Sequence, residues 1–319
     1  MAILTKPAEG ELEAFADAFD ASLRPLHASE GIEAGTVNTS YSLLLGPTKT
    51  RYFLRIYEEQ ETSGAEAEAA LLLHLAEAGV ATPCPVRARD GALVRTIARK
   101  PGVLFPWVDG DMLCQRAVRP EDARAVGAAL ARVHLAGPAP GSSLGPGRFG
   151  PPDLVLRCDR VARSNDSAAK VLASSLRAAV ESVAARRREL PSGLVHGDLF
   201  RDNVLWNEGR IAALLDFESA HHGPFAYDVA VTVLSWAYGD RLVPEIARAI
   251  VDGYRTVREL EEREREALFD ETVLATLRFT ITRITDEAIR VGKKWQRFVE
   301  RREAVERLGT AGLREVFGL

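Results

Sequence analysis

Residues 194–227, with the sequence LVHGDLFRDNVLWNEGRIAALLDFESAHHGPFAY, carry the polar residues that decide the fold. Apolar runs separate three polar features, which are a His-Gly-Asp triplet at 196–198, Asn203 and Asp216. The run at 211–215 is short and apolar, which predicts a buried strand with Asp216 emerging at its end. Residues 204–206 predict the partner strand of a hairpin. The stretch therefore predicts a loop that contains an Asp and an Asn, followed by a hairpin that ends in an Asp.

This order of residues is typical of protein-kinase-type phosphotransferases, in which the pattern HxDxxxxN precedes a metal-binding Asp. Phosphoryl transfer needs a carboxylate that orients the acceptor hydroxyl and accepts its proton, which suits Asp198. It also needs hard oxygen ligands for Mg²⁺, which Asn203 and Asp216 can supply. Glu218 would share the face of Asp216 if the strand continued, so it is a further candidate ligand of the metal or of a water. A lone Asp or Asn in a loop usually caps a helix or closes a turn, but the combined spacing, order and strand context favour catalysis.

The composition is typical of a soluble globular protein, with 319 residues of which 46% are hydrophobic and 27% are charged. The length predicts two domains or lobes. The net charge of −4 gives no indication of a basic surface, so we expect neither nucleic acid nor an anionic membrane as a partner. No apolar run approaches the roughly 18 residues of a membrane span. The three widely spaced cysteines indicate a reducing compartment, and we expect a cytoplasmic protein.

The N-terminal part predicts an antiparallel sheet. Residues 35–45 and 51–57 predict two strands joined by a turn. Two further apolar runs, 92–97 and 103–107, follow a hairpin turn expected at Asp90-Gly91. Together with an extended segment before that turn, these runs give a roughly five-stranded sheet.

Two features of this part could hold a nucleotide. The polar loop that starts at Gly35 could cover phosphates, although with a single glycine it is equally consistent with a plain surface turn. Arg55 lies in the second strand at the position of the phosphate-binding Lys of a kinase, and Arg is not a simple replacement for Lys. Glu68, favoured over Glu66, would be its partner from the helix predicted at 65–78. Either glutamate could instead lie on a solvated helix face.

The predicted fold class is α+β, with the two lobes of a protein-kinase-like fold. We expect residues 1–106 to form a nucleotide-binding N-lobe with an antiparallel sheet. Residues 107–319 would form a mostly helical C-lobe with the catalytic loop and the acceptor site. At the boundary, Phe105, Trp107 and Val108 would contact an adenine ring, although aromatic residues there could also simply pack.

Two segments of the C-lobe are informative. Residues 137–153 are rich in Gly, Pro and Ser, which predicts a long loop that is either mobile or a lid over the acceptor pocket. Asp228 begins a buried helix, where it could cap the helix and also hold the catalytic loop by hydrogen bonds.

Several motifs carry a resemblance to a known family. They are HGDLFRDNVLW at 196–206, GTVNTSY at 35–41, LRF at 277–279 with Asp286, and Asp228 directly after Tyr227. By these motifs the chain resembles the aminoglycoside phosphotransferase and choline kinase-like superfamily, and within it the homoserine kinases of the protein-kinase-like fold. The resemblance extends over most of the chain, from residue 31 to residue 289.

The resemblance implies an ATP-dependent kinase of a small alcohol, with homoserine as the expected acceptor and a place in threonine biosynthesis. It implies that Asp198 is the catalytic base, that Asn203 and Asp216 bind Mg²⁺, that Arg55 and Glu68 form a phosphate-holding ion pair, and that Asn38, Thr39 and Ser40 lie over the phosphates. Two departures leave the acceptor open. Ser40 replaces the Asn that is usual in the homoserine kinases, and the Asp-Phe-Glu at 216–218 with the His-His-Gly at 221–223 is nearer the wider superfamily.

Homoserine is a zwitterion, so its pocket should offer a cation to the carboxylate and an acid to the ammonium group. The candidates are Arg278 or Arg283 for the carboxylate and Glu218 or Asp240 for the ammonium, with Arg201 as a further acceptor-site candidate. Each of these residues is more often part of a structural ion pair. An aminoglycoside pocket would need several acids together, and the sequence shows no such cluster outside one solvated helix. An aminoglycoside, choline or sugar kinase, or a nucleotide-binding pseudokinase, are the alternatives.

Overall fold

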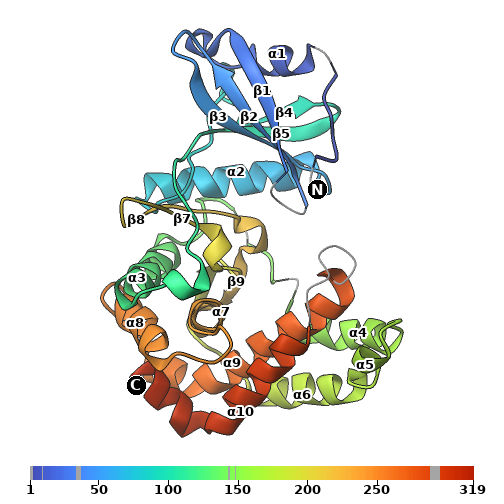
Figure 1. The fold of residues 1–319 in the computed structure, drawn as a ribbon, viewed down its shortest axis with the longest axis vertical. Helices are drawn as coiled ribbons and strands as arrows, with labels where there is room; N and C mark the ends of the chain where they lie inside the picture. The colour runs from blue at the N-terminus through green and yellow to red at the C-terminus, as the bar shows by residue number, and fades with distance from the viewer. Residues whose placement is uncertain (1–2, 9, 34–36, 143, 148, 288–294) are drawn as a thin grey trace. The chain divides into compact units, whose positions relative to one another are not determined.

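The computed structural model describes residues 3–8, 10–33, 37–142, 144–147, 149–287 and 295–319. The chain divides into two compact units. The first comprises Met1–Gly110, Pro138–Ser142 and Ala212–Leu215, and the second comprises Asp111–Gly137, Ser143–Ile211 and Asp216–Leu319. The first unit is built on an antiparallel sheet and the second is mostly helical (Figure 1). Within the described ranges, no helix is both long enough and apolar enough to cross a membrane.

The sheet of the first unit has five antiparallel strands in the order β1-β2-β3-β5-β4. They are β1 (Leu26–Ile32), β2 (Thr39–Leu45), β3 (Thr50–Ile56), β4 (Val94–Ile97) and β5 (Lys100–Pro106). The sequence did not predict β1, because this edge strand exposes its central residues and so lacks an apolar run. The turn between β4 and β5 lies at Ala98-Arg99, where φ is 47° and 63°. A turn does form at Asp90-Gly91, where the amide of Ala88 donates to the carbonyl oxygen of Ala92 at 2.8 Å, but it precedes β4 and joins none of these five strands to another.

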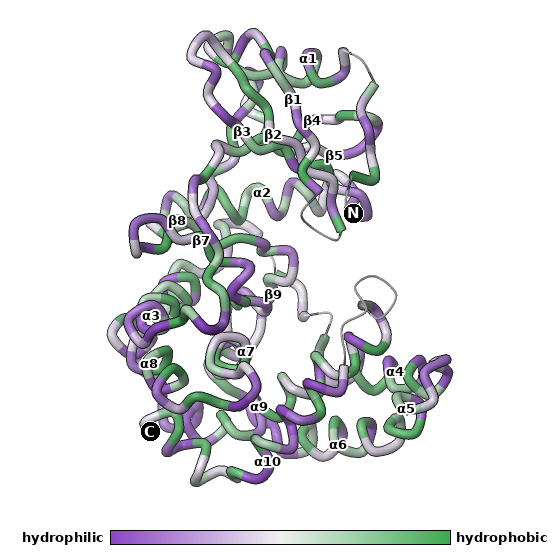
Figure 2. Tube along the Cα trace, viewed as in Figure 1, coloured by the Kyte–Doolittle hydropathy of each residue, from purple (hydrophilic) through white to green (hydrophobic). Residues whose placement is uncertain are grey.

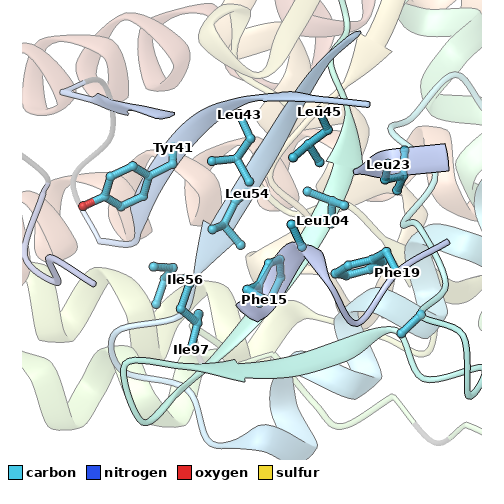
Figure 3. Close-up of a cluster of buried hydrophobic side chains, with 12 residues drawn as sticks. Phe15, Phe19, Leu23, Tyr41, Leu43, Leu45, Leu54, Ile56, Ile97 and Leu104 are labelled. Atoms are coloured by element: carbon cyan, nitrogen blue, oxygen red, sulfur yellow. The ribbon is translucent and has the colours of Figure 1, made fainter. Parts of the chain in front are cut away.

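One face of this sheet carries the hydrophobic core of the first unit (Figure 3). Side chains alternate between the two faces of a strand, so Leu43 of β2 and Leu54 of β3 point to the same side. Phe15 of α1 (Glu11–Ala16) and Phe19, which precedes the short helix η1 (Ala21–Leu23), cover this side with their rings 5.2 Å apart. The helix α2 (Thr62–Glu77) buries its predicted leucine stripe, Leu71, Leu72 and Leu75.

The second unit consists mainly of helices around a buried central helix, α7. Its helices are η2 (Gln115–Ala117), α3 (Pro120–Ala136), α4 (Pro151–Ala162), α5 (Ser167–Lys170), α6 (Ala173–Arg186), η3 (Arg201–Asn203), η4 (Phe217–Ser219), α7 (Phe225–Trp236), α8 (Pro244–Arg255), α9 (Glu262–Thr282), the π-helix η5 (Arg283–Glu287) and α10 (Gln296–Phe317). Its strands are β6 (Ser192–Val195), β7 (Val204–Asn207), β8 (Arg210–Leu214), whose last residues belong to the first unit, and β9 (His221–Pro224). β6 pairs with β9, and β7 pairs with β8 as predicted. Hydrophilic and hydrophobic residues alternate along α10 (Figure 2), whereas α7 is buried over almost its whole length.

Two glycines allow α3 and α8 to pack backbone against backbone. A Cβ atom added to Gly127 would lie 1.9 Å from the carbonyl oxygen of Ile250, and one added to Gly253 would lie 2.0 Å from the carbonyl oxygen of Arg124. Both obstacles are backbone atoms, so neither can rotate out of the way. Glycine at these two positions therefore sets the spacing of the two helices.

We expect Gly127→Ala to lower the free energy of unfolding by about 3 kcal/mol or more. Overpacking that side chains can relieve already costs about 1–3 kcal/mol, and here two helices would have to separate. Chemical denaturation measures the change. The control is Gly64→Ala in α2, where a new methyl group would meet only the side chain of Gln60, at 3.1 Å, and where the better helix propensity of Ala adds up to about 1 kcal/mol. Equal stability of the two variants would contradict the packing argument.

Candidate active site

The loop of residues 196–203, here called the catalytic loop, holds Asp198 and Asn203 in a fixed relation. The side-chain Nδ2 of Asn203 donates a hydrogen bond to the backbone carbonyl oxygen of Asp198 at 2.8 Å. Gly197 has φ 75°, and a Cβ atom there would lie 2.8 Å from the carbonyl oxygen of Ser219. Only glycine combines that backbone conformation with so close an approach.

Asp228 fixes the backbone of the catalytic loop. Its fully buried carboxylate accepts hydrogen bonds from the amides of His196 at 2.7 Å and Gly197 at 2.8 Å. A third bond, of 3.1 Å, joins it to Nε2 of His134. Burial raises the pKa of Asp228, but the hydrogen bonds from His134 and the Gly197 amide outweigh burial and lower the pKa overall. The prediction that Asp228 holds the catalytic loop is thus confirmed by its hydrogen bonds.

Asp198 lies beside a buried arginine of α9. Nη2 of Arg278 is 3.4 Å from the Asp198 carboxylate, and Nη1 donates to the backbone carbonyl oxygen of Gly197. The Arg278 guanidinium also lies 4.5 Å from the ring of Phe149. Removal from water raises the pKa of Asp198 to about 6; Arg278 opposes this shift and Asp216 adds to it. The carboxylate is therefore poised to exchange a proton near neutral pH.

Asp216 follows the end of β8, as the hairpin predicted, and has a left-handed backbone with φ 62°. Such a conformation is uncommon for a residue other than glycine and is often found at functional sites. Asp216 is close enough to Asp198 to raise its pKa. In Asn203, the bond from Nδ2 leaves the amide oxygen as the atom that can bind a cation. A neutral oxygen and a carboxylate oxygen are ligands that suit Mg²⁺.

Among the described residues, no three His, Cys, Asp or Glu side chains gather as a metal site. A cation held by Asn203 and Asp216 would therefore complete its coordination with water and substrate oxygens. This is the usual way in which proteins bind Mg²⁺ beside phosphates.

The other residues expected near the acceptor lie in different surroundings. Glu218 lies in η4 and not on an extended strand, because β8 ends at Leu214. Arg283 is buried at the start of η5, and its positive charge lowers the pKa of Asp198. Nε of Arg201 donates to the carbonyl oxygen of Ser235 at 3.3 Å, near the C-terminal end of α7. Asp240, after α7, is exposed. The structure therefore brings Arg278 and Arg283 close to Asp198 and leaves Asp240 at the surface.

In the first unit, Arg55 and Glu68 form the expected ion pair. Nη1 of Arg55 lies 3.0 Å from Oε1 of Glu68, and both side chains are largely buried. Glu66 is exposed, which is why Glu68 and not Glu66 meets the strand. Ser40 of β2 lies opposite Arg55 in the strand register. These polar side chains occupy the sheet face opposite to the hydrophobic core of Figure 3.

The residues expected to lie over phosphates are not all on that face. Thr39 is the cross-strand partner of Ile56, a core residue, and its buried Oγ1 accepts hydrogen bonds from the amides of Leu4 and Thr5 at 2.9 and 3.0 Å. Oδ1 of Asn38 accepts a hydrogen bond from the Glu58 amide at 3.2 Å. Gly35 lies outside the described residues. Of the three described residues in this group, Asn38, Thr39 and Ser40, only Ser40 lies opposite Arg55 in the strand register.

Aromatic residues surround the end of β5. Phe105 is buried with its ring centre 6.3 Å from that of Phe53, and the centre of the Trp107 ring is 6.4 Å from Phe53. The Arg51 guanidinium, which the sequence did not single out, stacks 3.5 Å from the centre of the Trp107 ring. Val108 is half-buried. An adenine ring could meet the edge of this aromatic group, and the same contacts are equally those of simple packing.

Comparison with known proteins identifies the family of this chain. Residues 29–269, more than half of the chain, match the model of the phosphotransferase enzyme family. The chain belongs to this family. A homoserine kinase of Gluconacetobacter diazotrophicus is 33% identical to it over 296 residues, which cover 90% of this chain and 89% of the relative. The predicted resemblance is thus confirmed.

Solved structures of other phosphotransferases share the fold. An aminoglycoside phosphotransferase from Alicyclobacillus acidocaldarius superposes with a TM-score of 0.65 at 17% identity, covering 99% of this chain and 98% of that one. Amicoumacin kinase, solved in complex with AMP-PNP, Ca²⁺ and Ami, superposes with a TM-score of 0.67 at 15% identity, covering 95% and 94%. The predicted α+β, kinase-like fold is confirmed.

Two residues beside this phosphotransferase site were missed by the sequence analysis. His134 of α3 and Tyr254 of α8 are buried, and their side chains meet at 2.8 Å although 120 positions separate them in the sequence. A single histidine within an apolar helix stripe carries no sign of its partner. The only available signal was the cost of burying a polar side chain, which requires that some partner exists.

We expect Asp228→Asn to impair both stability and phosphoryl transfer. An amide group has a single acceptor oxygen, so at least one of the amides of His196 and Gly197 would lose its buried acceptor. The expected loss in the free energy of unfolding is about 1–3 kcal/mol or more, with a lower kcat. Denaturation and steady-state kinetics check both.

The matched control is Asp252→Asn. Asp252 pairs with Arg124 at 3.4 Å on the surface of the same unit, where an ion pair contributes about 0–1 kcal/mol. Equal effects of the two variants would contradict a special role of Asp228.

Proposed function

We propose that this phosphotransferase is an ATP-dependent homoserine kinase, which transfers the γ-phosphoryl group of ATP to the hydroxyl of L-homoserine. The observation that carries the proposal is Asp198, a carboxylate with a raised pKa on a loop that is anchored from a buried helix. The identity of 33% to a protein named homoserine kinase over 90% of the chain supports this acceptor. We also propose that the enzyme acts in the cytoplasm, in threonine biosynthesis. Its three cysteines are free thiols, which suits a reducing compartment.

The proposed nucleotide site uses the first unit. Arg55, braced by Glu68 at 3.0 Å, would bind phosphate oxygens with its planar guanidinium. Ser40 is its neighbour on the same face, and we propose that the backbone of Asn38 and Thr39 adjoins the phosphates, because their side chains are engaged elsewhere. Phe105, Trp107 and Val108 would contact the adenine. Amicoumacin kinase was solved with a nucleotide analogue and a divalent cation. This supports the proposal that the present enzyme also uses a nucleotide together with a divalent cation.

The proposed chemistry uses the second unit. Asn203 and Asp216 would hold Mg²⁺, which when bound neutralises charge on phosphate oxygens. Asp198 would orient the acceptor hydroxyl and accept its proton. The acceptor oxygen forms a bond to the γ-phosphorus while the bond between that phosphorus and the β–γ bridging oxygen breaks, and ADP leaves. Arg278 would keep Asp198 in place through their contact of 3.4 Å.

The charges near Asp198 favour an acceptor that carries a carboxylate. Arg278 contacts Asp198, and Arg283 is near enough to lower the pKa of Asp198. We propose that Arg283, with Arg201, attracts the carboxylate of homoserine, and that Glu218 attracts its ammonium group. An aminoglycoside or choline offers no carboxylate to these arginines. This favours homoserine over the other acceptors of the superfamily.

We expect ADP release with Mg-ATP to be fast with L-homoserine and slow with L-threonine, choline, methylthioribose and kanamycin. Asp198→Asn should lower kcat by about 10²- to 10⁴-fold, the usual contribution of a general base, and should leave ATP binding intact. A coupled assay and calorimetric titration with the nucleotide measure the two quantities. Asp159→Asn in the surface pair with Arg177 serves as the control. Fast turnover of another acceptor would rule out homoserine as the specific substrate. Full activity of Asp198→Asn would rule out Asp198 as the general base.

We expect kcat/KM for the acceptor to fall below about pH 6, because protonated Asp198 cannot accept the hydroxyl proton. Arg278 lowers the pKa of Asp198, so Arg278→Met should move this limb to higher pH, whereas Arg278→Lys should leave it nearer its original place. A pH–rate profile of the three proteins tests the sign. The same limb in Arg278→Met and Arg278→Lys would speak against Asp198 as the titrating group.

A further inference from the structure

A buried chain of hydrogen bonds leads away from the catalytic loop through four helices of the second unit, α7, α3, α8 and α9. Nε2 of His134 lies 3.1 Å from Oδ2 of Asp228, and Nδ1 of His134 lies 2.8 Å from the hydroxyl of Tyr254. Nη1 of Arg258 donates to the same hydroxyl at 3.0 Å. Nη1 and Nη2 of Arg258 also donate to the two carboxylate oxygens of Glu264, each at 3.0 Å.

The chemistry of these groups indicates a direction for each bond. A guanidinium can only donate, so the Tyr254 oxygen accepts from Arg258. Burial raises the pKa of Tyr254, so the hydroxyl keeps its hydrogen, which it donates to Nδ1 of His134. Nδ1 then acts as an acceptor and bears no proton, and Nε2 carries the proton that is donated to Asp228.

The surroundings of His134 contain both charge signs. The groups that face it from the packed elements are Asp228 of α7, Tyr254 of α8, Arg258 after α8 and Glu264 of α9, and the ring of Phe225 stacks on it with centres 4.5 Å apart. The charge of His196, in the catalytic loop, also lowers the pKa of Asp228. Burial lowers the pKa of His134 and outweighs Asp228, which favours its protonation; the positive charge of Arg258 lowers it further. A buried carboxylate in contact with a histidine would ordinarily invite a second proton.

We propose that Arg258 and Tyr254 are positioning residues, which keep His134 neutral. The Asp228 carboxylate then keeps its hydrogen bonds to the amides of the catalytic loop. A doubly protonated His134 would draw the Asp228 carboxylate toward itself. The amide of His196 shares Oδ2 of Asp228 with His134, so its bond would weaken first. The orientation of Asp198 depends on that bond, because the amide belongs to the loop that carries Asp198.

If Arg258 served only to pack against its neighbours, its variants would show a different pH dependence. Arg258 lies over the ring of Phe225 at 4.4 Å and near the ring of Tyr254 at 5.8 Å, so its loss would also disturb contacts. Disturbed packing lowers stability and activity at every pH. It does not place a new histidine titration in the working range.

The test is the protonation state of His134, followed by the imidazole ¹⁵N shifts of labelled enzyme between pH 5.5 and 9. The chain has six histidines, and the signal of His134 is assigned by its absence in His134→Gln. In the unaltered enzyme we expect the neutral Nε2–H form at every pH. In Tyr254→Phe, where Nδ1 loses its donor, we expect a protonation midpoint within this range. Because no substrate is needed, this readout is independent of the proposed homoserine kinase activity.

Kinetics supply the second readout. Below its new midpoint, Tyr254→Phe should show a kcat about 10- to 100-fold lower than the unaltered enzyme at the same pH, as for other outer-shell partners, with an unchanged KM for ATP. Comparison at equal pH removes the contribution of Asp198. Tyr52→Phe is the matched control, because the Tyr52 ring packs against the hydrophobic cluster of the first unit.

Two further variants separate donation from packing. Arg258→Lys loses one of the two bonds to Glu264 but keeps a cationic donor for the Tyr254 hydroxyl, so His134 should stay neutral. Arg258→Met should behave as Tyr254→Phe. Neutral His134 in both Tyr254→Phe and Arg258→Met would overturn the proposal. A loss of kcat that is independent of pH and equal in Arg258→Lys and Arg258→Met would also overturn it, in favour of packing.

Discussion

The catalytic loop depends on the buried negative charge of Asp228. An ionised carboxylate is costly to remove from water unless its oxygens receive hydrogen bonds. Asp228 receives two from backbone amides of the catalytic loop and one from His134. The loop therefore cannot move away without leaving a bare charge inside the protein. A flexible stretch of chain thereby acquires the rigidity of the central helix.

Two carboxylates a short distance apart in the second unit have opposite properties. Hydrogen bonds lower the pKa of Asp228 despite its burial, whereas burial raises that of Asp198 to about 6. The difference lies in the donors, since Asp198 faces a guanidinium nitrogen at 3.4 Å and Asp228 has three shorter bonds. One carboxylate is thus fixed as a structural anion and the other can exchange a proton, a division of tasks that enzymes often achieve by environment alone.

The sequence predicted what short-range patterns encode. The hairpin that ends at Asp216 follows from its apolar runs. The ion pair of Arg55 with Glu68 follows from the resemblance to kinases, and the anchoring role of Asp228 from its place near the start of a buried helix. The sequence did not predict β1, whose exposed edge has no apolar alternation. The chain of His134, Tyr254 and Arg258 joins residues that are remote in sequence, so no local pattern announces it. The side chain of Thr39 lies on the core face of the sheet, because one step along a strand reverses the face of a side chain.

The two glycines between α3 and α8 acquire a meaning beyond packing. Gly127 and His134 are separated by two helical turns on one face of α3, and Gly253 directly precedes Tyr254. The interhelical distance that the glycines permit is thus also the distance across which the His134 ring meets the Tyr254 hydroxyl at 2.8 Å. A methyl group at either glycine would lengthen the hydrogen bond between His134 and Tyr254 without contacting either side chain. Selection for catalysis would then act on residues that have no functional atoms of their own.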